Sequence, residues 1–173
     1  MYIKTERLEL KPFSAADEAR AVLLLTNAVV KQTYMLPDFA EPQDAVPLFQ
    51  RLMALSLEDG RYVAGIYLDG LLIGILNETE VCDRSIEVGY ALLPDYYNQG
   101  YATEALQGAA GFLLDQGFAR VIAGAFESNI ASIRVMVKAG FSLLDKADTI
   151  EYRGRTHRCV YYGLQNPIHY GRL

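Results

Sequence analysis

The segment from Asp95 to Ala105 has the residue types of a site that binds an anion through its backbone. It follows an alternating apolar stretch, Ile86 to Leu93, that predicts a strand, and it leads into a helical pattern from Thr103 to Gln116. The first N–H groups of a helix have no partner within the helix, and the positive end of the helix dipole favours an anion there. Gly100 and Ala102 carry little or no side chain, so a phosphate can approach the backbone. The segment therefore predicts a pyrophosphate cradle.

Two other phosphate-binding patterns are absent from the sequence. It contains no GxxxxGK[ST], and therefore no P-loop lysine that could reach a terminal phosphate. It also contains no GxGxxG after a predicted strand, which is the pattern of dinucleotide-binding folds. Both of these nucleotide-binding classes are set aside.

The predicted strand from Ile86 to Leu93 also presents a carboxylate. Because side chains alternate across a strand, Glu87 projects over Gly89 and Ala91, a face with room above it. Glu87 is either a solvated carboxylate on an open sheet face or a general base that takes a proton from an amine, directly or through water. Freeing a side-chain amine of pKa about 10 at pH 7 costs roughly 4 kcal/mol, against about 1 kcal/mol for an α-amine. An α-amine would therefore need less help from Glu87.

The remaining pattern predicts the elements that position these residues. Helices are expected from Ser14 to about Asn27, from Gln43 to Leu57 and from Asn129 to Ala139. Further strands are expected from Thr5 to Phe13, Arg61 to Tyr67, Leu71 to Asn77, Val121 to Phe126, Ser142 to Asp145 and His157 to Leu164. Irregular segments are expected from Gln32 to Pro42, Glu78 to Arg84 and Thr149 to Arg155. This order predicts an α+β fold with a mixed sheet covered by helices.

Composition bounds the class of protein. A chain of 173 residues fits one domain and can bury a substantial core. The formal net charge of -5 argues against non-specific binding to nucleic acid or to an acidic membrane, and no apolar run is long enough to span a membrane. No signal peptide is evident, so we expect a cytoplasmic protein. Cys82, Cys159, His157 and His169 are not clustered, which predicts no metal site and a reducing compartment.

A second motif, Ser128-Asn129-Ile130-Ala131-Ser132, leads to Gly140-Phe141 at the end of the helix predicted from Asn129 to Ala139. This motif and the run Tyr97-Asn98-Gln99-Gly100-Tyr101-Ala102 together resemble the GNAT N-acetyltransferase superfamily. The acetyl-CoA loop of that superfamily is written [QR]xxGx[GA], so Tyr97 departs from the pattern at its first position. The serine form of the second motif and the Thr-Glu-Arg-Leu-x-Leu opening around Arg7 resemble the RimJ/RimL branch. The resemblance covers roughly residues 1 to 165.

The resemblance implies a GNAT-type fold, in which a mixed, mostly antiparallel sheet is flanked by helices. The domain would span residues 1–173, with its core at about 5–165. The resemblance also implies acetyl-CoA as cosubstrate. The pantetheine arm would lie like an added strand, where a splay or bulge opens the thioester pocket, along Ala91, Leu92 and Leu93. The pyrophosphate would bind the backbone N–H groups of Gln99, Gly100, Tyr101, Ala102 and Thr103, while Asn129 would face the pantetheine arm.

The leaving thiolate needs a hydrogen-bond donor. Many GNAT enzymes place a tyrosine seven residues after the asparagine as a general acid, but the residue there is Met136, which cannot donate a proton. By resemblance to RimL-like members, Ser132 takes this role by hydrogen bonding to the developing thiolate. Purely structural roles are also open, with Asn129 as a helix N-cap and Ser132 as an ordinary serine early in a helix.

The function that follows is acetyl transfer from acetyl-CoA to a primary amine by direct attack in a ternary complex, with Glu87 and Ser132 catalytic. The acceptor could be a protein N-terminal amine, as the RimJ/RimL resemblance suggests, or a small amine such as a polyamine, an amino acid or an antibiotic. A third hypothesis is a catalytically inactive acyl-CoA-binding sensor, because Met136 departs from the pattern. Acceptor specificity is expected in the segment Gln32 to Pro42, the second helix and the 78–84 loop. The protein is expected to be a monomer or homodimer.

Overall fold

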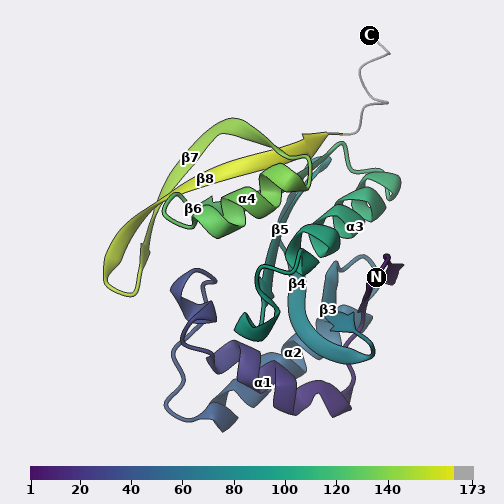
Figure 1. The fold of residues 1–173 in the computed structure, drawn as a ribbon, viewed down its shortest axis with the longest axis vertical. Helices are drawn as coiled ribbons and strands as arrows, with labels where there is room; N and C mark the ends of the chain where they lie inside the picture. Colours follow the sequence, from purple (N-terminus) through teal and green to yellow (C-terminus); the bar gives the residue numbers. More distant parts are fainter. Residues whose placement is uncertain (166–173) are drawn as a thin grey trace.

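The strands of the chain pair into one mixed sheet (Figure 1). The computed structural model describes residues 1–165, and the sheet has the order β1-β2-β3-β4-β5-β6-β8-β7. The strands are β1 (Ile3–Lys4), β2 (Leu8–Lys11), β3 (Val63–Leu68), β4 (Leu71–Cys82), β5 (Ser85–Leu92), β6 (Arg120–Phe126), β7 (Ser142–Tyr152) and β8 (Arg155–Gln165). Only β5 and β6 pair in parallel, and all other neighbours are antiparallel. The predicted α+β class with a mostly antiparallel sheet is confirmed.

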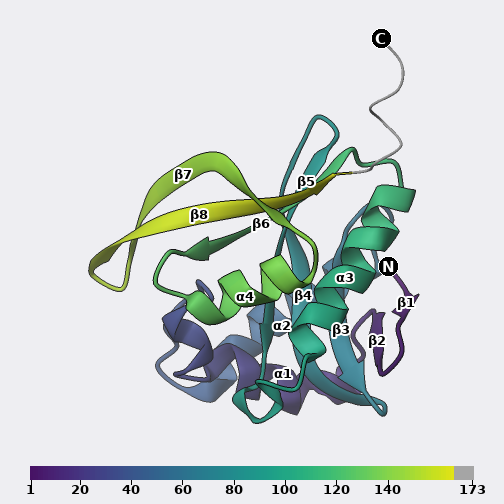
Figure 2. The same ribbon diagram turned by 45° about the horizontal axis from the view of Figure 1, so that its top comes forward.

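Two pairs of helices cover the two faces of this sheet (Figures 1 and 2). The helices are α1 (Glu18–Thr26), α2 (Val46–Leu57), α3 (Tyr101–Asp115) and α4 (Ile130–Lys138). Short 3-10 turns at Ala15–Asp17 and Pro42–Ala45 precede α1 and α2. Leu24 of α1 and Phe49 of α2 are buried in one hydrophobic cluster, whereas Leu106 of α3 and Met136 of α4 are buried in the other. Met136 is therefore a core residue.

The two hydrophobic clusters lie on opposite faces of the sheet, and side chains of β5 enter both, as the alternation of this strand predicted. Ile86, Val88 and Leu92 are buried against α3 and α4. Ala91 is buried on the opposite face, with α1 and α2, and so is Leu93 just beyond the strand. Glu87 shares that second face by the same alternation. The core thus fixes which β5 side chains can reach a ligand on each side of the sheet.

Two predicted loops are wrong. The segment Glu78 to Arg84 is mostly strand, because β4 continues to Cys82 and only Asp83 and Arg84 form the turn to β5 (Figure 2). The segment Thr149 to Arg155 also belongs mostly to β7 and β8, with the turn confined to Arg153–Gly154. The side chains at the end of the β4–β5 hairpin are mostly polar and exposed, so backbone pairing forms it without an apolar pattern to reveal it. In the β7–β8 hairpin, Ile150 and Tyr152 are partly buried and alternate with exposed residues, but this alternation is short and ends at the turn.

Other boundaries shift by a few residues. Helix α3 begins at Tyr101, two residues before the predicted start. The first predicted strand is shorter, since residues 5–7 form a turn between β1 and β2. None of the helices within residues 1–165 has both the length and the apolar composition to cross a membrane. His169 and the rest of the predicted 1–173 domain beyond residue 165 lie outside the described residues.

Candidate active site

Strands β5 and β6 separate in the middle of the sheet, and the point where their pairing ends is called the parting. Their parallel ladder contains three residue pairs, the last of which joins Glu87 to Ile122. Beyond this pair, β5 continues along β4 and β6 continues along β8. The edge of β5 that faces the parting can therefore offer backbone N–H and C=O groups to an extended ligand. Ala91 and Leu92 lie on this stretch and Leu93 follows it, so the predicted splay is present and begins just after Glu87.

The predicted cradle lies at the start of α3. Gly100 is the N-cap residue, and its φ of 84° is in the left-handed region that favours glycine. The N–H of Glu104 bonds back to the carbonyl of Gly100 at 3.0 Å. The N–H groups before it precede the first intrahelical bond, which leaves them for an anion. The loop and first turn bring the predicted residues together: Gln99, Gly100, Tyr101, Ala102 and Thr103.

An ion pair between Arg7, near the N-terminus, and Glu104, in the first turn of α3, braces this cradle. The carboxylate of Glu104 accepts hydrogen bonds from the backbone N–H and the Nε of Arg7, both at 2.7 Å, and from Thr5 Oγ1 at 2.6 Å. Arg7 Nη1 also donates to the carbonyl of Gln99 at 3.0 Å, and the guanidinium lies 4.5 Å from the ring centre of Tyr101. Arg7 and Glu104 lie 97 residues apart in the chain, so no local sequence pattern indicated this brace.

The hydrogen bonds of this brace change the pKa of the Glu104 carboxyl. Burial opposes ionisation, but the hydrogen bonds from Thr5 and Arg7 outweigh it and lower the pKa of the Glu104 carboxyl below its usual value. The carboxylate therefore stays ionised at neutral pH and holds the turn before β2 against the start of α3.

Ser132 and Asn129 lie together at the start of α4. The Oδ1 of Asn129 accepts a hydrogen bond from the N–H of Ser132 at 3.2 Å, which confirms the N-cap role of Asn129. The Oγ of Ser132 lies 2.8 Å from the Oη of Tyr90, which also donates to the Ser132 carbonyl at 3.3 Å. Burial raises the pKa of Tyr90 to about 12, although the hydrogen bond with Ser132 acts in the opposite direction. Tyr90 packs against the same cluster as Ile86 and Val88 of β5, but the sequence did not indicate its contact with Ser132.

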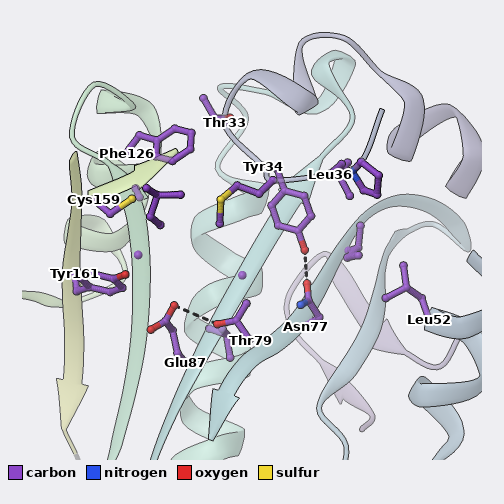
Figure 3. A pocket seen from close by; sticks show the side chains of 18 of the residues that line it. Thr33, Tyr34, Leu36, Leu52, Asn77, Thr79, Glu87, Phe126, Cys159 and Tyr161 are labelled. Atoms are coloured by element: carbon purple, nitrogen blue, oxygen red, sulfur yellow. Dashed lines mark hydrogen bonds between the residues drawn. The ribbon is translucent and has the colours of Figure 1, made fainter. Parts of the chain in front are cut away.

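A pocket of about 320 Å³ opens on the opposite face of the sheet, where β5 and β6 part (Figure 3). Glu87 lines this pocket, and its carboxylate accepts a hydrogen bond from Thr79 Oγ1 at 3.1 Å. Lys146 Nζ lies 3.7 Å from the other carboxylate oxygen. The Glu87 side chain is only 19% exposed, so it does not stand on an open sheet face. The solvated interpretation of Glu87 does not fit this environment.

The roof of the pocket is a segment between α1 and α2. Tyr34 of this segment donates a hydrogen bond to the side-chain oxygen of Asn77 on β4 (Figure 3). The Oη of Tyr152, at the end of β7, donates to the carbonyl of Lys31 at 2.8 Å and accepts from the N–H of Leu36 at 3.3 Å. The β7–β8 hairpin thus fixes the roof from the far end of the sheet.

The pocket draws on the regions in which acceptor specificity was predicted, and on others. The predicted regions contribute Thr33, Tyr34, Met35, Leu36, Pro37, Leu48, Leu52 and Thr79. Strands β6, β7 and β8 contribute a wall that the sequence did not indicate, formed by Gly124, Ala125, Phe126, Ile150, Cys159 and Tyr161. Glu87 and Ser132 approach the parting from opposite faces of the sheet, so a thioester lying in it would pass between them.

Known proteins share this sequence pattern and architecture. The family model of the acetyltransferase (GNAT) domain matches residues 7–142. The chain belongs to the GNAT acetyltransferase family. It is therefore an acetyl-CoA-dependent N-acetyltransferase, and the cradle and the free edge of β5 fit the cosubstrate of that family.

Relatives of this GNAT protein are found in both sequence and structure. YnaD, an uncharacterized N-acetyltransferase of Bacillus subtilis (strain 168), is 30% identical over 146 residues, which cover 81% of this chain and 82% of YnaD. YoaA of the same organism, also an uncharacterized N-acetyltransferase, is 26% identical over 144 residues, covering 80% and 81%. The structure of RimL, a ribosomal L7/L12 alpha-N-protein acetyltransferase in complex with coenzyme A, has a TM-score of 0.84 and 20% identity, covering 95% of this chain and 98% of RimL.

Metal ligands are not grouped in this GNAT domain as far as residue 165. No set of three or more His, Cys, Asp or Glu side chains in that range is placed to hold an ion. Cys82 is exposed and Cys159 is buried, and both are free thiols.

Replacing Gly100 with valine should weaken acetyl-CoA binding at least tenfold, or by about 1.4 kcal/mol, because a branched side chain would obstruct the approach of the pyrophosphate. Isothermal titration calorimetry measures the dissociation constant of acetyl-CoA for the variant and the parent. The matched control is Gly117→Val just beyond the other end of α3, where φ is also positive at 99° and an added Cβ would meet nothing within 4 Å. Both variants should lose stability, but only Gly100→Val should lose affinity. Equal acetyl-CoA affinity in the two folded variants would exclude this cradle.

Replacing Glu104 with glutamine should lower the melting temperature at pH 7, and the difference from the parent should shrink in acid. A lowered folded-state pKa means that the stabilisation is complete above the unfolded pKa of about 4.3 and is lost as pH falls through the folded value. Thermal unfolding from pH 7 to pH 3 tests this, with Glu58→Gln at an exposed site as control. A difference that stays constant down to pH 3 would mean that the brace does not depend on the charge of Glu104.

Proposed function

We propose that this GNAT protein transfers the acetyl group of acetyl-CoA to a primary amine by direct attack in a ternary complex, with Glu87 as general base and Ser132 as donor to the leaving sulfur. The observation that carries the proposal is the parting of β5 and β6. A backbone cradle and Ser132 lie on one side of it, and a pocket with a carboxylate lies on the other. Two substrates can therefore approach one point from opposite faces.

The chemistry follows from these positions. The acceptor amine enters the pocket, and Glu87 takes its proton directly or through water. The nitrogen lone pair attacks the thioester carbonyl carbon, and the nitrogen then loses its second proton by the same route. The C–S bond breaks with its electron pair going to sulfur. The Oγ–H of Ser132 donates a hydrogen bond to that sulfur, an interaction that strengthens as negative charge develops.

A covalent route through the enzyme is not needed. Cys159 is the thiol that lines the pocket, and burial, together with the charges of Asp148 and Glu87, raises its pKa. The thiol therefore stays protonated at neutral pH and is a weak nucleophile. The sensor hypothesis also loses its basis, because Met136 belongs to the core and Ser132 supplies a donor at the site instead.

The acceptor that fits best is the α-amine of a protein N-terminus. Glu87 is the one carboxylate among the described lining residues and already faces Lys146, whereas a polyamine would need further negative charges along the pocket. The pocket is at the lower end of ligand-site sizes, which suits one terminal residue better than a long ligand. An α-amine also has the lower pKa and needs less help from a single base. The solved structures of similar fold include RimL, named as an alpha-N-protein acetyltransferase.

Replacing Glu87 with glutamine should slow acetyl transfer at pH 7, and the loss should shrink as pH rises toward the pKa of the amine, where free amine becomes abundant. The measurement is the ratio of the variant rate to the parent rate from pH 6 to pH 10. Glu80→Gln is the matched control, because Glu80 lies opposite Glu87 on β4 but is exposed and outside the pocket. A ratio that does not change with pH would contradict the role of base.

A thiol-release assay with acetyl-CoA should show turnover with peptides that carry a free N-terminus and little or none with spermidine. The panel contains hexapeptides that differ in their first residue, the same hexapeptides with a blocked N-terminus, a small aromatic amine and spermidine. Blocking the N-terminus should abolish turnover. Preference for the aromatic amine over every peptide would reassign the acceptor to a small molecule, and an absence of turnover with all amines would return the sensor hypothesis.

A further inference from the structure

The hydrogen bond between Tyr90 and Ser132 joins two elements at the parting of the sheet. Tyr90 comes from β5, whose free edge begins just before it, and Ser132 comes from the first turn of α4. Their hydroxyl oxygens lie 2.8 Å apart, a normal distance for a hydrogen bond between two hydroxyls. Both side chains are partly buried and face the α3–α4 side of the sheet. The bond is therefore a contact at the proposed site and not a surface contact.

Two proton arrangements are possible at this contact. In one, the Ser132 hydroxyl donates to Tyr90 while the Tyr90 hydroxyl donates to the Ser132 carbonyl, which lies 3.3 Å away. The proton of Ser132 then points at Tyr90. In the other, Tyr90 donates to the Oγ of Ser132, and the Ser132 proton is released to point elsewhere. Only the second arrangement lets Ser132 donate to a thioester sulfur.

We propose that Tyr90 is a positioning residue that orients the hydroxyl of Ser132 toward the leaving sulfur and strengthens its hydrogen bond. This rests on the proposed function, in which Ser132 is the donor to the thiolate. A hydroxyl that accepts one hydrogen bond is polarised and becomes a better donor in the next, so the two bonds reinforce each other. Position 136 carries a buried methionine and offers no hydroxyl. The tyrosine hydroxyl that contacts Ser132 comes from Tyr90 on β5 instead.

The proton balance requires no transfer from Tyr90. Its pKa of about 12 keeps the phenol protonated throughout the pH range of the assays. A thiol of pKa about 8.5 is a stronger acid than this phenol, so the proton stays on oxygen. A protonated acceptor amine loses two protons: Glu87 takes one before the attack and passes it to water, and the second leaves the nitrogen after the attack by the same route. The coenzyme A thiolate takes one proton from water, so one proton is released in each turnover. Tyr90 and Ser132 end the reaction as they began it.

A double-mutant cycle tests the proposal, with Tyr90→Phe, Ser132→Ala and the double variant assayed with acetyl-CoA and the fastest amine of the panel. Tyr90→Phe should lower kcat by about threefold to tenfold, the usual effect of one lost hydrogen bond, with KM for acetyl-CoA within twofold of the parent. Ser132→Ala should lower kcat by roughly tenfold to a hundredfold. Adding Tyr90→Phe to Ser132→Ala should change nothing further, because Tyr90 acts only through Ser132.

Tyr62→Phe is the matched control. Its ring packs against the same hydrophobic cluster but contacts Phe118 just beyond the other end of α3, so kcat should be unchanged. Thermal unfolding of every variant separates lost stability from lost rate.

Three results would decide against Tyr90. A parent-like kcat in Tyr90→Phe, or a kcat loss of the same size with and without Ser132, overturns its role while leaving Ser132 as the donor. A parent-like kcat in Ser132→Ala overturns both the donor role in the proposed function and the positioning role built on it.

Discussion

The early end of the pairing between β5 and β6 is the constraint on which the site depends. Each of these strands is paired on its outer edge, β5 with β4 and β6 with β8, but beyond Glu87 and Ile122 their inner edges separate. Unpaired backbone groups inside a sheet need another partner, and an extended ligand that lies along β5 can provide it. In the proposed function, the donor substrate and the acceptor substrate would meet at this separation, beside the pocket that Glu87 lines.

The two ends of the site are held by contacts from opposite ends of the chain. Arg7 and Glu104 fix the start of α3, where the pyrophosphate would bind, and Tyr152 fixes the roof of the pocket through backbone groups of Lys31 and Leu36. These side chains are not proposed to touch a reacting atom. Their effect is to keep a loop and a roof segment in place, since neither has an extended ladder of its own to do so.

The donor side of the proposed site differs from the pattern of many GNAT enzymes in the residues that carry its hydroxyl groups. Met136 is an apolar residue buried in the core, at the position where many GNAT enzymes carry a tyrosine. Ser132 and Tyr90 place two hydroxyls at the parting from α4 and β5 instead. At 20% identity, the similarity to RimL establishes the fold and does not extend to this pair of hydroxyls.

The sequence by itself determined what depends on neighbouring residues: the cradle around Gly100, the cap formed by Asn129, and the face of β5 on which Glu87 lies. Each follows from local backbone geometry, a helix start or the alternation of a strand. The tertiary structure alone decided the contacts between residues far apart in the chain, such as Arg7 with Glu104, 97 residues away, and Tyr90 with Ser132, 42 residues away. Strand order and register create those contacts, and no local pattern encodes them. The polar end of the β4–β5 hairpin was missed for a related reason, because backbone pairing holds it where no buried face leaves a pattern in the sequence.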